Sequence, residues 1–317
     1  MTNTAKNIVA LAGGVGGAKL AYGLAQITPP GQLTIIVNTG DDFEHLGLHV
    51  SPDLDTVMYT LAGAANPITG WGVKDESWNM MAALARYGGP TWFQLGDRDL
   101  ATHILRSNWL REGYPLSWVT GELGRRLGVR HTILPMSDQP VRTKVETDEG
   151  ELAFQEYFVK RQCGPVVKRI YFEGAEEAQP AQEVINAIRK ADAIIFCPSN
   201  PLLSLDPILA LPNVRRIIAA SRTPKVAVSP IVQGEALKGP AAKLMRELGL
   251  EVSPGGVARY LKDVLSGFVL DTLDEAHQDA ITDLGLRTLV TGTVMMNNED
   301  RVRLAKAVLE FAGVEVG

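Results

Sequence analysis

Four carboxylates follow the second apolar run of the chain and could bind a divalent cation. Asp41 and Asp42 end the segment NTGDD, and Asp53 and Asp55 follow in SPDLDT. Crowded carboxylates repel one another unless a cation or hydrogen-bond donors offset their charge. Magnesium commonly takes one or two carboxylates together with substrate phosphates and water. We therefore expect a Mg²⁺ site here, with Asp42 and Asp55 as the better candidates, because Asp53 could instead cap a helix that begins near Leu54.

A glycine-rich segment, AGGVGGAKL, follows the first apolar run. Its glycines would let the backbone approach an anion, whose charge is favoured by the free N–H groups at a helix start. The segment lacks the third glycine of a dinucleotide fingerprint and the Gly-Lys-Ser/Thr ending of a P-loop, which argues against an NAD site and an ATPase. The alternatives are a tight turn without a ligand and a merely solvated Lys19. The candidate phosphate-binding residues are Gly13, Gly14, Gly16, Gly17 and Lys19.

The segment FQLGDRDLATHILR resembles a strand that runs into a helix. Arg98, Thr102 and Arg106 share one helical face, with Arg98 in the first turn beside the expected strand end. Because arginine clamps phosphates and carboxylates well, we expect Arg98 to act on the substrate. The alternative is that Asp97 caps the helix and pairs with Arg98. His103 could also bind substrate, although a single helical histidine is more often structural.

A further polar turn follows the buried run AIIFC. Ser199, Asn200 and Pro201 form this turn, and the segment VAVSPIVQGEALKGPAAKLM repeats the arrangement of strand, Ser-Pro turn, glycine and helix. Polar turns at several strand ends indicate one shared crevice, since ligands of open α/β sheets bind at the carboxyl ends of the strands. The sequence contains no Gly-x-Ser-x-Gly, His-Glu-x-x-His or Cys-x-x-Cys motif, so neither a hydrolase triad nor zinc chemistry has support.

The elements that position these residues alternate between strand and helix. Helical periodicity appears at about 17–27, 53–64, 98–111, 180–190, 240–248, 273–284 and 298–312. Runs rich in β-branched residues predict buried strands at Ile8–Leu11, Leu33–Val37, Ala193–Cys197, Val226–Val228, Phe268–Leu270 and Thr288–Val290. This alternation predicts an α/β fold with a Rossmann-like, doubly wound, mostly parallel sheet.

The pattern changes between about 131 and 172, where short, partly alternating runs surround a turn at 148–150. Such a pattern predicts a small antiparallel insertion. Because no repeat or disordered linker interrupts the chain, we expect residues 1–317 to form a single α/β domain with an inserted lobe at about 131–172.

Composition excludes several classes of protein. The chain has 317 residues and a formal net charge of −5, which argues against a nucleic-acid-binding surface. No stretch approaches the ~20 apolar residues of a membrane span, and the two cysteines are too few for a disulfide framework. We therefore expect a cytoplasmic enzyme, in which local cations must attract any anionic substrate.

Seven segments together resemble the 2-phospho-L-lactate transferase family, known as CofD in archaea and FbiA in actinobacteria. The resemblance runs from about residue 8 to 265. It rests on GGVGGAKLA, NTGDD, SPDLDTVMYTLAG, GDRDLATHILR, MSDQPVRT, CPSNPLLSLDPIL and VAVSPIVQGEALKGPAAKLM.

The resemblance implies a transferase of coenzyme F-420 biosynthesis. Such an enzyme moves a phosphate-linked three-carbon acid from a guanosine diphosphate conjugate to the ribityl hydroxyl of Fo, 7,8-didemethyl-8-hydroxy-5-deazariboflavin. It releases GMP, requires Mg²⁺ and is a homodimer. The acid is phospholactate, phosphoenolpyruvate or phosphoglycerate, and the sequence does not identify which.

The resemblance also implies roles for individual residues. Asp55 and Arg98 would be catalytic and would contact Fo, and Asp41 or Asp42 would hold Mg²⁺ together with Asp55. The glycine-rich segment and the turn at 199–201 would line the nucleotide or phosphate region. A competing interpretation is a YvcK-like regulatory protein, which binds a nucleotide sugar without transfer chemistry and would ignore Fo.

Overall fold

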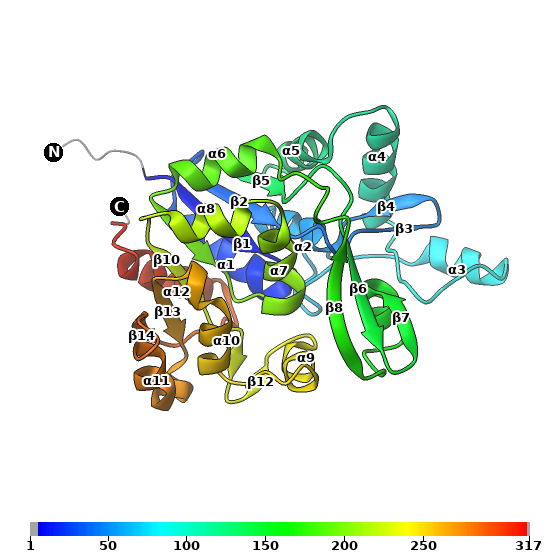
Figure 1. Ribbon diagram of the computed structural model, residues 1–317. Coiled ribbons are helices and arrows are strands. Elements are labelled where there is room, and N and C mark those ends of the chain that lie inside the picture. The colour runs from blue at the N-terminus through cyan, green and yellow to red at the C-terminus, as the bar shows by residue number, and fades with distance from the viewer. Residues whose placement is uncertain (1–5, 316–317) are drawn as a thin grey trace.

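The computed structural model describes residues 6–315 and is built on a seven-stranded sheet in the order β14-β13-β10-β9-β1-β2-β5 (Figure 1). Every neighbouring pair of these strands is parallel. Apolar side chains fill both faces, as expected of a parallel sheet that is covered on both sides. The strands are β1 (Ile8–Ala12), β2 (Leu33–Val37), β5 (Thr132–Pro135), β9 (Ala193–Phe196), β10 (Lys225–Val228), β13 (Gly267–Leu270) and β14 (Arg287–Val290).

Helices cover both faces of the sheet, because alternate residues of each strand point to opposite sides. Ile8 and Ala10 of β1 belong to a core with α1, α2, α5 and α12, whereas Val9 and Leu11 belong to a core with α6, α8, α10 and α11. The longer helices are α1 (Gly14–Ile27), α2 (Pro52–Leu61), α3 (Asn79–Arg86), α4 (Asp99–Arg111), α5 (Leu116–Arg126), α6 (Gln182–Lys190), α10 (Pro254–Leu261) and α12 (Asn298–Phe311). The shorter ones are α7 (Asp206–Ala210), α8 (Val214–Ala220), α9 (Ala241–Glu247) and α11 (Gln278–Thr282).

The strand order reverses between β1 and β9. From β1 the chain moves outward through β2 to β5, and from β9 it moves the other way through β10 and β13 to β14. The loops after β1 and β9 therefore diverge at the point where open α/β sheets bind ligands. The glycine-rich loop follows β1, and the turn at 198–200 follows β9.

A three-stranded antiparallel sheet is inserted between β5 and α6, beside the main sheet (Figure 1). Its strands are β6 (Arg142–Thr147), β7 (Gly150–Ala153) and β8 (Val167–Glu173). A second small lobe, formed by the hairpin β3 (Phe43–His45) and β4 (Leu48–Val50) with α3 and α4, packs around Val50, Met81 and Leu95.

The structure confirms the expected fold class and each of the six expected strands, and it corrects two details. The run HTILPM is not part of the insertion: β5 pairs in parallel with β2 at the edge of the main sheet. β5 has only four residues and ends in a proline, so its sequence did not distinguish it from the short strands of the insertion that follow. Residues 93–95 form no strand, and α4 begins at Asp99. The expectation that residues 1–317 form a single domain stays a prediction. Within residues 6–315, no helix is long and apolar enough to cross a membrane.

Candidate functional site

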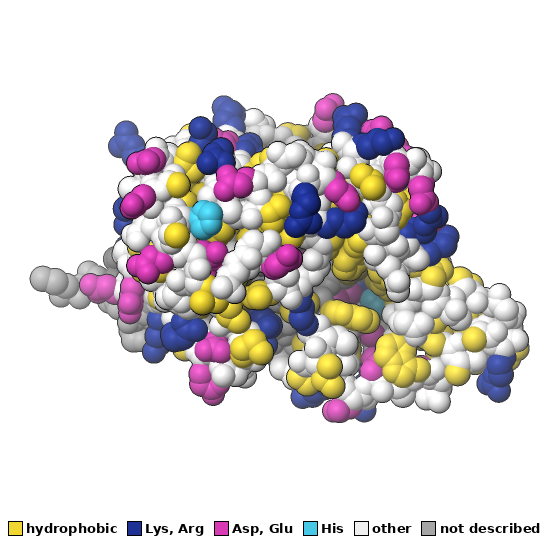
Figure 2. All heavy atoms as spheres, turned by 90° about the horizontal axis from the view of Figure 1, so that it is seen from below, with side chains coloured by type: hydrophobic (Ala, Val, Ile, Leu, Met, Phe, Trp, Pro, Cys, Tyr) yellow, Lys and Arg dark blue, Asp and Glu magenta, His cyan; other side chains and the backbone are white. Residues whose placement is uncertain are grey.

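A cavity of ≈ 690 Å³ lies at the carboxyl ends of β1, β2, β9 and β10. The insertion contributes Phe154, Gln155 and Phe158 to its wall, and the loop after α2 contributes Thr69 and Trp71. Figure 2 shows this face of the molecule hollowed, with hydrophobic side chains around the opening and acidic and histidine side chains inside. The cavity therefore combines an apolar rim with a charged interior.

The glycine-rich loop and the turn after β9 are locked together by Ser199. The backbone N–H of Gly13 donates to Ser199 Oγ at 3.1 Å, and that hydroxyl donates to the Gly13 carbonyl at 2.9 Å. A Cβ added at Gly16 would lie 2.3 Å from the carbonyl oxygen of Pro198, and one at Gly17 would lie 2.5 Å from Ser199 Oγ. The two loops can touch only because these residues are glycines. Ser199 therefore holds the loops together, and it also lines the cavity.

Asn200 caps the π-helical turn Pro201–Leu205 and also faces the cavity. Its Oδ1 accepts hydrogen bonds from the backbone N–H groups of Leu202 and Leu203, while its buried Nδ2 has no partner in the described part of the chain. A buried amide without a partner is costly. Asn200 thus offers a free donor to a ligand, whereas Pro201 is buried and does not line the cavity.

Asp41 and Asp53 form a buried pair of carboxylates in the cavity. Asp53 accepts from the Gly14 N–H at 2.8 Å and from Asn38 Nδ2 at 3.0 Å. Burial raises the pKa of Asp53 to about 6, and burial together with the charge of Asp53 raises the pKa of Asp41 well above its usual range. Within residues 6–315 neither carboxylate has an ion-pair partner, so the pair lacks a positive charge. Ser51 precedes α2 as its N-cap, and Asp53 reaches across to the start of α1 and does not cap α2.

Asp42 lies outside the cavity wall. Its Oδ2 accepts from Ser51 Oγ at 2.7 Å and lies 3.0 Å from His49 Nε2. Asp55 contacts Arg106 and not Asp42, and the expected Mg²⁺ site of Asp55 with Asp41 or Asp42 stays a prediction.

Asp55 pairs with Arg106 of α4, and both side chains are buried. The guanidinium donates to both carboxylate oxygens of Asp55, with Nη1 3.0 Å from Oδ2. His103 lies beside this pair, with Nδ1 3.7 Å from Asp55 and Nε2 3.4 Å from Asp99. Asp99 in turn accepts from the Tyr59 hydroxyl at 2.6 Å. The sequence predicted roles for His103 and Asp55, but it predicted none for Arg106, whose positive charge offsets the negative charge of Asp55.

One ligand atom from each of Asp55, Asp99 and His103 lies within 4.8 Å of the others, which could in principle hold a metal ion. The Arg106 guanidinium already supplies a positive charge there, and a cation beside it would be repelled. The Asp41–Asp53 pair has no such cationic partner among residues 6–315 and could also hold a metal ion.

The two cations expected from sequence take different positions. Lys19 lines the cavity, where its ammonium donates to the Met295 carbonyl at 2.7 Å, and burial and Arg301 lower its pKa. Arg98 does not line the cavity: its side chain is exposed and donates to the Lys74 carbonyl at 3.2 Å. Arg98 stands at the N-cap of α4 and contacts Lys74, whereas Arg106 pairs with the buried Asp55.

Comparison with known proteins identifies the family. The family model described as 2-phospho-L-lactate transferase CofD matches residues 8–294. The chain belongs to this CofD family. Among its relatives, the phosphoenolpyruvate transferase of Streptomyces griseus is 45% identical over 311 residues, 96% of this chain and 98% of the relative. The 2-phospho-L-lactate transferase of Methanopyrus kandleri is 40% identical over 317 residues, 98% of this chain and 99% of the relative.

The fold of this CofD family member is also found in a solved structure of low sequence identity. A crystal structure of a UPF0052 family protein from Bacillus halodurans matches with a TM-score of 0.64 and 18% identity, over 96% of this chain and 98% of that protein. At this identity the match shows the shared fold alone.

No role was predicted from the sequence for two charged residues: Arg106, which pairs with the cavity residue Asp55, and Lys238, which lines the cavity itself. Arg106 was noted only as a member of a helical face, and a signal for its burial was its place one turn after His103. Lys238 lies in the loop before α9 and lines the cavity. Only the fold brings it to a site that begins more than 200 residues earlier.

Proposed function

We propose that the protein transfers a phosphate-linked three-carbon acid from a guanosine diphosphate conjugate to the ribityl hydroxyl of Fo, releasing GMP. Family membership supports a transferase, and the relatives' names support a phosphorylated three-carbon acid. The observation that carries the proposal is the meeting of the α1 start, the Asp41–Asp53 pair and the free amide of Asn200 in one cavity at the switch point.

A Mg²⁺ ion fits this arrangement at Asp41 and Asp53. Both carboxylates are buried and lack a cationic partner, and Mg²⁺ prefers one or two carboxylates together with phosphate oxygens. When bound, the ion would supply positive charge to the diphosphate of the donor. Thr143 Oγ1 and the Asn38 side chain would then orient the two carboxylates, since Thr143 lies 3.4 Å from Asp41 Oδ1.

The other residues that line the cavity form two regions, one suited to phosphate and one rich in aromatic side chains. The first turn of α1 has backbone N–H groups without helical partners; that of Gly14 donates to Asp53, and the others favour an anion. Phe93, Phe154, Phe158 and Trp71 line the cavity and offer apolar surfaces to a flat deazaflavin ring. We therefore assign the donor to the glycine-rich loop and Fo to the aromatic side chains of the cavity.

The transfer step depends mainly on alignment and charge stabilisation. The ribityl oxygen forms a bond to the phosphorus that carries the acid, the bond from that phosphorus to the GMP oxygen breaks, and the hydroxyl proton passes to the carboxylate of Asp55. We assign Asp55 to the acceptor hydroxyl, because Arg106 holds its carboxylate in the cavity wall. The transferred group is a phospholactyl, enolpyruvyl-phosphate or phosphoglyceryl group. We also propose that the protein acts as a homodimer, and light scattering of the purified protein tests this.

Binding of Fo separates this proposal from a YvcK-like regulator. In equilibrium dialysis with mass-spectrometric detection, the wild-type protein should retain Fo, and retention should not require a nucleotide sugar. A protein that retained a nucleotide sugar but not Fo would be a regulator, and the transferase proposal would be wrong.

A further inference from the structure

Two loops from distant parts of the chain meet over the cavity through Lys238 and Thr69. The ammonium of Lys238 donates to the Thr69 carbonyl at 2.7 Å. Thr69 belongs to the loop after α2, and Lys238 to the segment between β12 (Glu235–Ala236) and α9. Both residues line the cavity, and Lys238 is exposed.

The Lys238 ammonium lies close to the start of α1. A Cβ built at Gly70 would be 2.6 Å from Val15 Cγ1 and 3.4 Å from Lys238 Nζ, so the Thr69–Gly70 turn rests between the glycine-rich loop and this ammonium. The positive charge of Lys238 is also one cause of the lowered pKa of Lys19, after burial and Arg301. Two ammonium groups thus share the end of the cavity where the phosphates are expected.

The charges in the cavity wall favour a role for Lys238 in binding an anionic ligand. The wall contains four carboxylates, those of Asp41, Asp53, Asp55 and Asp99, and its lysines are Lys19 and Lys238. Lys19 is held by the Met295 carbonyl inside the fold. Lys238 is bound only to a neutral carbonyl at an exposed position, and a charge-assisted bond to a phosphate would be stronger.

Lys238 lies in a segment that contains two glycines with positive φ. Gly234 and Gly239 flank it with φ of +74° and +76°, in the left-handed region that glycine adopts without strain.

We propose that Lys238 binds the diphosphate of the guanosine diphosphate donor, exchanging its bond to the Thr69 carbonyl for a bond to a phosphate oxygen. This inference rests on the proposed function, because it assumes that the donor is a guanosine diphosphate conjugate. The sequence alone had pointed to Arg98, and not to Lys238, as the cation that acts on the substrate.

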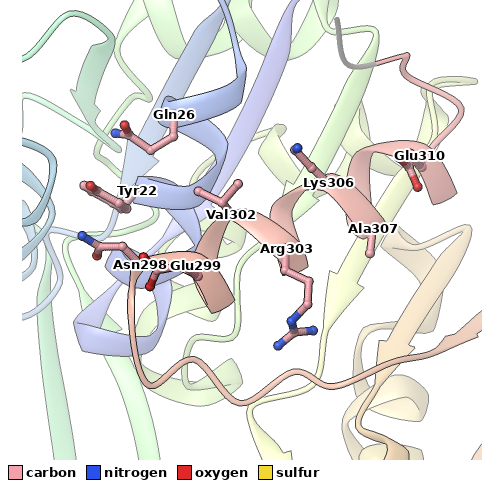
Figure 3. A pocket seen from close by; sticks show the side chains of 9 residues that line it. All are labelled: Tyr22, Gln26, Asn298, Glu299, Val302, Arg303, Lys306, Ala307 and Glu310. Atoms are coloured by element: carbon pink, nitrogen blue, oxygen red, sulfur yellow. The ribbon is translucent and has the colours of Figure 1, made fainter.

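Titration calorimetry with guanosine diphosphate and Mg²⁺ tests the inference on the wild-type protein and on Lys238→Met, Lys238→Arg and Lys306→Met. Lys306 is the matched control. It is an exposed lysine of α12 in a separate, open hollow formed by α1 and α12 (Figure 3). Guanosine, which has no phosphate, serves as the control ligand.

We expect Lys238→Met to weaken binding of guanosine diphosphate by about tenfold or more, Lys238→Arg to retain most of the affinity, and Lys306→Met to leave it unchanged. Guanosine should bind all four proteins equally. If the wild type binds guanosine diphosphate and Lys238→Met binds it as tightly, the inference about Lys238 is wrong while the proposed donor stands. If the wild type does not bind guanosine diphosphate, the proposed donor is wrong and the inference falls with it.

Discussion

Arg106 donates to both carboxylate oxygens of Asp55 in a pair that is almost fully removed from solvent. The exposed fractions of the two residues are 1% and 5%. Burial alone would raise the pKa of Asp55, and the adjacent guanidinium opposes that effect. The pair therefore fixes the position of a carboxylate in the cavity wall while compensating its charge.

Removing Arg106 should destabilise the fold. Arg106→Met leaves the Asp55 charge buried without a partner, which typically costs about 3–5 kcal/mol. The double variant Asp55→Asn, Arg106→Met removes that charge and should recover most of the lost free energy of unfolding. Urea denaturation of the wild type, both single variants and the double variant measures this coupling, and additive effects would show that the pair does not interact.

The two arginines of the GDRDLATHILR segment should differ in their effect on turnover. Arg98 is exposed outside the cavity, so Arg98→Ala should keep most of the wild-type kcat. Arg106→Lys keeps the charge but loses the two-point contact with Asp55, so kcat should fall about tenfold or more while KM for the donor changes little. Steady-state kinetics of both variants decides the matter: a large loss in Arg98→Ala alone would restore the catalytic role that the sequence suggested.

Close contact between the loops after β1 and β9 should make Gly16 intolerant of a side chain. In Gly16→Ala the new methyl group would meet the Pro198 carbonyl oxygen, and we expect a loss of about 1–3 kcal/mol in stability. Gly121, in α5, is the control, because a Cβ there meets nothing within 4 Å. Gly121→Ala should stabilise the protein by about 0.5–1 kcal/mol, as measured by thermal and urea unfolding. Equal effects at both glycines would contradict the packing argument.

Binding of Mg²⁺ should weaken as the pH falls through 6. Asp53 has a pKa raised to about 6 and that of Asp41 is also raised, so protons compete with the metal ion for both carboxylates at mildly acidic pH. Below pH 6 we expect the affinity to fall by roughly tenfold per pH unit for each proton displaced. Calorimetric titration of Mg²⁺ between pH 5 and 8 measures this dependence. Asp53→Asn should abolish binding, whereas Asp42→Asn should bind Mg²⁺ like the wild type, and the opposite result would move the metal site to Asp42.

The strands of the main sheet were predictable because burial on both faces leaves a continuous apolar signal. Leu33–Val37 is observed as predicted, and the edge strand Thr132–Pro135 was missed because it is short and adjoins an alternating region. The convergence of the glycine-rich loop, Asp41 and the turn at Asn200 followed from the rule that ligands bind at strand carboxyl ends.

The charge pairing inside the site was not predictable from the sequence. The role of Arg98 stays a prediction; the sequence did not indicate that its side chain is exposed and donates to the Lys74 carbonyl. Asp53 looked like a helix cap, since a carboxylate after Ser-Pro fits that role, and only the fold shows that it reaches Gly14. Lys238 has no local signal, because its neighbours in the cavity come from α1 and the loop after α2.

The most direct test of the proposed function is a transfer assay followed by mass spectrometry. The protein is incubated with Fo, Mg²⁺ and, separately, the guanosine diphosphate conjugates of lactate, enolpyruvate and glycerate. We predict release of GMP and a product whose mass equals Fo plus the phosphate-linked acid of one conjugate. Folded protein that binds a nucleotide sugar and forms no such product from any of the three conjugates would contradict the proposed transfer.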